Sequence, residues 1–223
     1  MKRLFGGDKS LLIAQLLDAL AGEVCPICTR VAEAEHRQID MLLHERVNDG
    51  RTRDALATAH GFCAEHTRLL LEVGGRGCHA KIALLYAAQM AALADEIEQL
   101  PAQGETNGAL QTDCLVCANV KRTEGLYGEM LARRLAEPRF RQALADGPGL
   151  CLTHLRQVYA LAAPAERALL REMQATRLRA LSHHLREFAR KSAQVAQGVR
   201  EPFGDERDSW IRALRVYNGD LPG

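Results

Sequence analysis

Residues that favour β-strands are scarce in this sequence of 223 residues. It contains 10 Val, 6 Ile and 9 Thr against 34 Ala and 33 Leu, and this balance favours helices over strands. No run of 18 or more apolar residues is present, which predicts that no segment spans a membrane. We therefore expect an all-α protein with no membrane association.

Net charge is nearly absent as well. The 29 basic and 28 acidic groups leave a net charge of +1, which argues against generic nucleic-acid binding. An anionic partner could still meet a group of arginines in the second half of the chain, although arginines at helical spacing usually only solvate a helix face. These arginines are Arg133, Arg134, Arg139 and Arg141.

The N-terminal segment does not have the pattern of an export signal. Charged and polar residues interrupt its apolar stretch, and the spacing of Leu12, Leu16 and Leu20 fits an amphipathic helix. We therefore expect a cytoplasmic protein. In a reducing compartment, cysteine pairs more often hold metal or do redox work than form structural disulfides.

Six of the seven cysteines lie in an internal duplication. CPIC at 25–28 corresponds to CLVC at 114–117, and GFCAEH at 61–66 corresponds to GLCLTH at 149–154. The duplicated ligand-type residues are Cys25, Cys28, Cys63 and His66 in the first copy, and Cys114, Cys117, Cys151 and His154 in the second. Only Cys78 has no counterpart, and we interpret it as a small buried apolar residue.

The residue types and spacings of the two copies predict metal binding. A Cys-x-x-Cys at the start of a helix places two sulfurs near one ion, and the positive end of the helix dipole favours the thiolates that bind metal. Adding Cys-x-x-His gives three sulfurs and one nitrogen, the ligand set of a closed structural zinc site. We predict two zinc ions per chain. The alternatives are an iron–sulfur cluster and a thiol redox or metal-handling centre.

Each copy contains two half-sites, a Cys-x-x-Cys and a Cys-x-x-His. Their spacing alone does not show which half-sites share a metal ion. We expect each copy to close its own site, because such a unit could have existed before the duplication. In the alternative arrangement, Cys25 and Cys28 meet Cys151 and His154 across the duplication.

Glu35 and Glu124 occupy equivalent positions, two helical turns after the second cysteine of each pair. Each carboxylate could hydrogen-bond a ligand histidine from behind. We favour an ordinary ion pair with a nearby arginine, such as Arg37 or Arg68 for Glu35.

Glycine and proline positions divide the chain into successive elements. The expected divisions are an N-terminal helix within 1–24, a first helical repeat with its metal site over 25–100, a linker over 101–113, a second repeat with its metal site over 114–163, and a long helix with a tail over 164–223.

In the tail, Asp205 is expected to cap a short helix, with Trp210, Ile211 and Leu214 facing the rest of the protein. We favour simple packing of Trp210 into an apolar gap. The alternative is that it forms the wall of a ligand pocket in which Arg212 meets an anion.

These motifs together resemble a family of bacterial proteins that is classified as a domain of unknown function. That family has the doubled cysteine and histidine arrangement and a closing G-x-E-x-D-S-W-x-R-A segment. Here the closing segment comprises Gly204, Glu206, Asp208, Ser209, Trp210, Arg212 and Ala213, and the resemblance covers nearly the whole chain. It implies a bacterial, metal-binding helical protein, and it carries over no activity.

Our leading hypothesis for function is a non-enzymatic, zinc-stabilised scaffold that binds an unknown protein or small-molecule partner between its repeats. The alternatives are a thiol redox or metal-handling protein, and a small-ligand binder or enzyme with a pocket between the repeats. No Ser/His/Asp order, Walker loop or dinucleotide fingerprint supports an enzyme. The oligomeric state stays open.

Overall fold

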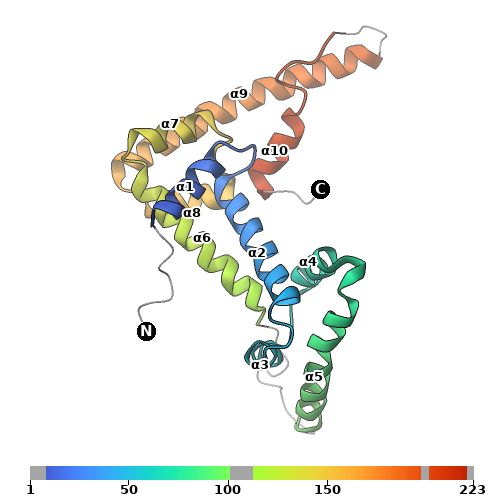
Figure 1. Cartoon of the computed structure of the whole chain (residues 1–223). Helices are drawn as coiled ribbons and strands as arrows, with labels where there is room; N and C mark the ends of the chain where they lie inside the picture. The colour runs from blue at the N-terminus through green and yellow to red at the C-terminus, as the bar shows by residue number, and fades with distance from the viewer. Residues whose placement is uncertain (1–8, 101–112, 197–200, 220–223) are drawn as a thin grey trace. The chain divides into compact units, whose positions relative to one another are not determined.

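The computed structural model describes residues 9–100, 113–196 and 201–219 (Figure 1). Within these ranges the chain forms α-helices and one short 3₁₀ helix, without any strand, which confirms the all-α prediction. The elements are α1 (Lys9–Leu20), α2 (Pro26–His44), α3 (Gly50–Thr58), α4 (Ala64–Gly74), η1 (Gly75–Gly77), α5 (His79–Glu98), α6 (Leu115–Arg134), α7 (Pro138–Asp146), α8 (Leu152–Leu161), α9 (Pro164–Ala196) and α10 (Ser209–Asn218).

The chain divides into two compact units. The first unit comprises Met1–Arg30 and Glu124–Gly223, and the second comprises Val31–Thr123. The boundary between the units therefore falls inside α2 and again inside α6. Each unit contains parts of both sequence repeats.

In the first unit, α1 packs against α7, and α10 packs against α8 and α9. The core is formed by large side chains that are fully buried: Leu16, Leu20, Leu131, Leu135 and Phe140. The end of α7 approaches α1 so closely that a Cβ on Gly147 would lie 2.0 Å from the backbone oxygen of Leu20. Glycine is therefore required at this helix end.

In the second unit, α3 packs against α5. Its core includes the fully buried residues Ile39, Leu43, Leu56 and Leu85. Cys78 belongs to this same core and is 5% exposed, which confirms its interpretation as a small apolar residue.

None of the helices in the described ranges is both long enough and apolar enough to cross a membrane. The proposed linker over 101–113 lies outside the described residues, except for Asp113.

Polar contacts attach the tail to α9. The Glu206 carboxylate accepts a hydrogen bond from the Gly204 N–H at 3.0 Å and pairs with Lys191 at 2.7 Å. The Lys191 ammonium, together with this backbone N–H, lowers the pKa of Glu206 to about 2. Glu201 adds a second ion pair, with Arg190, at 2.9 Å.

The expected docking of Trp210 is wrong. Its side chain is 49% exposed, and Leu214, one turn later, is 46% exposed, whereas Ile211 is half-buried. The face of α10 that points inward instead carries Ser209, which is fully buried, and the half-buried Arg212. Because Arg212 finds partners in Asp208 and in the Asp205 carbonyl, this polar face packs and the aromatic face remains outside.

The expected helix cap at Asp205 is also displaced. The N-cap of α10 is Asp208, which makes no capping hydrogen bond through its side chain. Its carboxylate pairs with Arg212 at 3.0 Å instead.

Candidate metal centres

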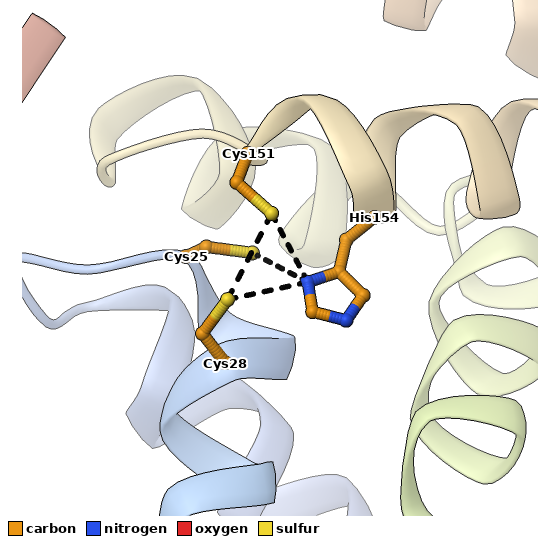
Figure 2. Close-up of side chains that lie close together, drawn as sticks. All are labelled: Cys25, Cys28, Cys151 and His154. Atoms are coloured by element: carbon orange, nitrogen blue, oxygen red, sulfur yellow. Dashed lines mark hydrogen bonds between the residues drawn. The ribbon is translucent and has the colours of Figure 1, made fainter. Parts of the chain in front are cut away.

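The eight predicted ligands gather into two clusters of four. The first centre contains Cys25, Cys28, Cys151 and His154 (Figure 2), and the second contains Cys63, His66, Cys114 and Cys117. In each cluster the four ligand atoms lie within 4.8 Å of one another, so each cluster could hold one metal ion. The half-sites therefore pair across the duplication, and the expectation that each copy closes its own site is wrong.

Helix geometry explains the crossed pairing. Glu35 is seven residues after Cys28 on the continuous helix α2, a rise of about 10.5 Å at 1.5 Å per residue. The Nε2 atom of His66 lies 2.9 Å from the Glu35 carboxylate. His66 is thus held two turns away from Cys28 and cannot share a metal ion with it.

The second copy repeats this relation on α6. Glu124 is seven residues after Cys117, and its carboxylate lies 3.4 Å from Nε2 of His154. In both copies the glutamate contacts the histidine of its own repeat, whereas that histidine completes the centre opened by the other repeat's Cys-x-x-Cys.

Each Cys-x-x-His is placed by the same backbone turn. Gly61 and Gly149 have φ values of 81° and 80°, a conformation that favours glycine. Two residues later, Cys63 and Cys151 are the N-caps of α4 and α8, with φ/ψ of −65°/167° and −67°/164°. The two copies therefore present their Cys-x-x-His pairs with nearly identical local geometry.

Each Cys-x-x-Cys also opens a helix. The carbonyl of Cys25 accepts a hydrogen bond from the Thr29 N–H at 3.0 Å, and that of Cys114 accepts one from the Ala118 N–H at 3.2 Å. Every centre is thus formed where two helix N-termini meet. Their dipoles favour negative charge at this point, and thiolates supply it.

In the first centre, Nδ1 of His154 faces the three sulfurs, as Figure 2 shows. Its distances to Sγ of Cys25, Cys28 and Cys151 are 3.5, 3.3 and 3.2 Å. The Cys28 and Cys151 sulfurs are 3.8 Å apart.

The second centre has matching dimensions. Nδ1 of His66 lies 3.1, 3.4 and 3.3 Å from Sγ of Cys63, Cys114 and Cys117. The Cys63 and Cys117 sulfurs are 3.7 Å apart. Both centres thus direct Nδ1 toward the sulfurs and Nε2 toward a glutamate, a division of roles typical of metal-binding histidines.

The two glutamate contacts differ in quality. The contact of Glu35 with His66 is a hydrogen bond, and our preference for an arginine partner of Glu35 is therefore wrong. Glu124 is farther from its histidine, and Nε2 of His154 is buried without a hydrogen-bond partner in the described part of the chain.

In both centres the histidine and one neighbouring cysteine favour each other's charged forms, imidazolium and thiolate. Burial opposes protonation of His66, but hydrogen bonds with Glu35 and Cys63 outweigh it and raise its pKa. Burial also opposes ionisation of Cys63, yet the hydrogen bonds and charge of His66 lower the pKa of this thiol to about 7.

In the first centre, hydrogen bonds from neighbouring thiols lower the pKa of Cys151. Burial and the neighbouring thiols raise the pKa of Cys117 to about 12, and the neighbouring thiols raise the pKa of Cys28. Each centre therefore stabilises one thiolate, the form that binds metal, at Cys63 and at Cys151.

The end of α10 lies against the first centre. Gly219 is buried and has φ 75°, and a Cβ on it would lie 2.7 Å from Sγ of Cys28 and 3.8 Å from Sγ of Cys151. The sequence does not reveal this contact. The glycine after a helical pattern predicts a helix end, but nothing in its position indicates a metal centre formed by residues far earlier in the chain.

The arginine group of the second half is largely occupied by carboxylates. Arg133 pairs with Glu129 at 3.1 Å, and Arg139 pairs with Glu137 at 3.1 Å. Arg134 also pairs with Glu137. These contacts fit a solvated helix face and give no support to an anionic partner there.

Residues 11–223 match a family described as a family of unknown function, DUF6062. The chain belongs to the DUF6062 family. This confirms the resemblance to a domain-of-unknown-function family. No curated protein and no solved structure matches the chain. For this member of DUF6062, the two centres are the features that indicate a function.

Proposed function

We propose that this chain is a zinc-binding helical protein with two structural Cys₃His centres, and that it acts as a non-enzymatic scaffold or interaction module. The observation that carries the proposal is the spacing of the ligand atoms. Around a tetrahedral zinc with Zn–S of about 2.3 Å and Zn–N of about 2.0–2.1 Å, neighbouring sulfurs are about 3.8 Å apart and sulfur and nitrogen about 3.6 Å. One sulfur–sulfur distance in each centre matches this value, 3.8 Å between Cys28 and Cys151 and 3.7 Å between Cys63 and Cys117. The sulfur–nitrogen distances, 3.1 to 3.5 Å, are slightly shorter than the zinc value.

The same spacing favours a single ion over an iron–sulfur cluster. In a cluster the four protein ligands are divided among two or four irons, so ligands of different irons lie farther apart than ligands around one ion. Four ligand atoms within 4.8 Å fit one ion better.

Four protein ligands also favour a structural role for the metal. Catalytic zinc sites use three protein ligands and leave the fourth position to water or substrate. Here each centre supplies four. A thiol redox role is less well supported, because each of the six clustered sulfurs lies beside a sulfur from a second segment and an imidazole, a ligand set that suits a metal ion, and all seven cysteines are free.

The scaffold part of the proposal rests on what the centres join and on what α10 exposes. The first centre connects segments 123 residues apart, and the second connects segments 48 residues apart or more. On α10, Trp210, Leu214 and Tyr217 are exposed on one helix face, which supports contact with a protein partner. Free cysteines throughout also fit a reducing, cytoplasmic location.

The test is metal analysis of the purified protein, followed by chelation. We expect about two zinc equivalents per chain and a colourless solution. Because structural zinc contributes on the order of 10 kcal/mol of apparent binding free energy, its removal should abolish much of the helical circular-dichroism signal, and added zinc should restore it. Iron with inorganic sulfide, or a melting curve that does not change on chelation, would refute the proposal.

A further inference from the structure

A cavity of about 840 Å³ lies within the first unit, beside the first metal centre. Its walls come from the segment before α2, the loop between α7 and α8, and the facing sides of α9 and α10. Cys25 and Cys151 lie in its wall. The volume falls within the range of about 300–1,000 Å³ that is typical of small-molecule sites.

Charge in this cavity is arranged by depth. The basic groups that line it are half-buried, whereas its acidic groups are exposed. The basic groups are Arg177, Arg212, Arg215 and His184, and the acidic groups are Glu23, Asp146, Glu172 and Asp208. The inner surface is thus cationic, and the carboxylates face solvent.

Two of the three arginines already have acceptors. Arg177 donates to the backbone carbonyls of Leu144 and Ala145 at 3.0 and 2.8 Å, and burial lowers its pKa. Arg212 pairs with Asp208 at 3.0 Å, and its guanidinium lies 3.3 Å from Nδ1 of His184.

Arg215 is different. Its Nε atom is buried, and no hydrogen bond or ion pair joins its guanidinium to any group in the described part of the chain. Nε of Arg212 also makes no hydrogen bond, but it lies 3.0 Å from the Asp208 carboxylate. A half-buried guanidinium without any acceptor is unfavourable, and an anion in the cavity that Arg215 lines would supply an acceptor for its terminal N–H groups. Apolar side chains, among them Met173, Leu181 and Val216, line the same cavity.

We propose that this cavity binds a small amphipathic anion, whose carboxylate or phosphate group is held by Arg215 and whose apolar part lies against α9 and α10. Guanidinium binds both oxyanions through paired N–H donors. This inference goes beyond the scaffold proposal and assigns a ligand site to the first unit.

The experiment is calorimetric titration of the full, zinc-loaded chain with hexanoate, with inorganic phosphate, and with neutral hexanamide. We expect saturable binding of hexanoate or of phosphate, and the tighter of the two identifies the oxyanion. Hexanamide should bind at least tenfold more weakly than hexanoate. Failure of both anions to bind, or equal binding of hexanamide and hexanoate, would overturn the proposal.

Variants locate the site. Arg215→Met keeps an apolar stem of similar length and should weaken anion binding by tenfold or more. The matched control is Arg207→Met, an exposed arginine beside α10 that does not line the cavity, and it should bind as the parent does. Arg215→Lys, which keeps the charge and loses the planar fork, should fall between them and serves if Arg215→Met does not fold.

Zinc content is measured in every variant. Two zinc equivalents with lost anion binding show that the cavity, and not the metal centre, has been altered. Unchanged anion binding in a folded Arg215→Met variant would reject the assignment.

Discussion

The first centre contacts the end of α10 and borders a cavity. The cysteines of the second centre instead pack in or against the core of the second unit. Three ligands of the first centre are buried and one is half-buried, against two of each in the second. The histidine contact differs in the opposite sense, since Glu35 hydrogen-bonds His66 while Glu124 stays 3.4 Å from His154.

This contrast separates what the duplication kept from what it did not. Ligand types, N-cap positions and the positive-φ glycines are the same in both copies, and these fix the geometry of four ligand atoms. The surroundings are not shared, because α9 and α10 belong to the first unit. We infer that metal binding stabilises both units in the same way. A role in ligand binding would belong to the first unit alone, since only this unit contains α9 and α10.

Pairs of ligand substitutions test most directly which cysteines share a centre. Cys25→Ser combined with Cys151→Ser should remove one zinc and leave one, because both residues belong to the first centre. Cys25→Ser combined with Cys63→Ser should remove both. Elemental analysis of the purified variants measures the count.

Cys78→Ser is the control for this pair of variants, and it should keep two zinc ions because Cys78 belongs to the core and to neither ligand cluster. If the two double variants gave the reverse counts, each repeat would close its own centre and the crossed pairing would be wrong.

A smaller effect is expected from the glutamates behind the histidines. Loss of such a contact typically costs about 10- to 100-fold in metal affinity. Glu35→Gln should reach this range at the second centre, whereas Glu124→Gln should have less effect at the first, because its contact is longer. Competition with a zinc chelator gives both affinities.

Single-centre backgrounds make the glutamate comparison clean. Cys151→Ser leaves only the second centre for Glu35→Gln, and Cys63→Ser leaves only the first for Glu124→Gln. Equal losses of affinity at the two centres would show that the longer Glu124–His154 distance, 3.4 Å against 2.9 Å for Glu35–His66, does not weaken that contact.

A substitution at Gly219 tests whether the end of α10 affects zinc binding at the first centre. Alanine at Gly219 must adopt a backbone conformation that costs about 1–3 kcal/mol, and its Cβ would press on Sγ of Cys28. We expect Gly219→Ala to weaken zinc binding at the first centre by about tenfold, since each 1.4 kcal/mol is about a factor of ten.

Gly75→Ala is the matched control for Gly219→Ala. Gly75 has φ 46° and ψ −155°, close to the 75° and −137° of Gly219, but a Cβ on Gly75 would point into open space, with nothing within 4 Å. It should cost folding stability without changing zinc affinity at the first centre. Equal zinc affinities in the two variants would show that α10 does not act on Cys28.

The sequence predicts the helices and the ligands well, because both depend on local patterns. Pro26 and the leucine spacing locate helices, and the repeated Cys-x-x-Cys and Cys-x-x-His identify the eight ligands. Pairing is not local. It follows from the seven-residue offset between Cys28 and Glu35, and this offset excludes a shared ion only once Glu35 is known to contact His66.

The tail illustrates a different limit. Trp210, Leu214 and Tyr217 form an apolar stripe, and such a stripe ordinarily faces the core. Here Ser209 and Arg212 face inward, and Arg212 contacts the Asp205 carbonyl of its own segment and the His184 imidazole of α9. Hydrophobic periodicity shows which residues share a helix face. It does not show whether that face or the opposite one is buried, because this depends on contacts with distant parts of the chain.

The crossed pairing also bears on the ancestry of the fold. A chain with a single repeat would hold one Cys-x-x-Cys and one Cys-x-x-His that cannot meet around the same ion. Two such chains, associated through a twofold axis, would complete two identical centres by exchanging these halves. The reciprocal pairing of the ligand pairs is the one that gene fusion of such a homodimer would leave.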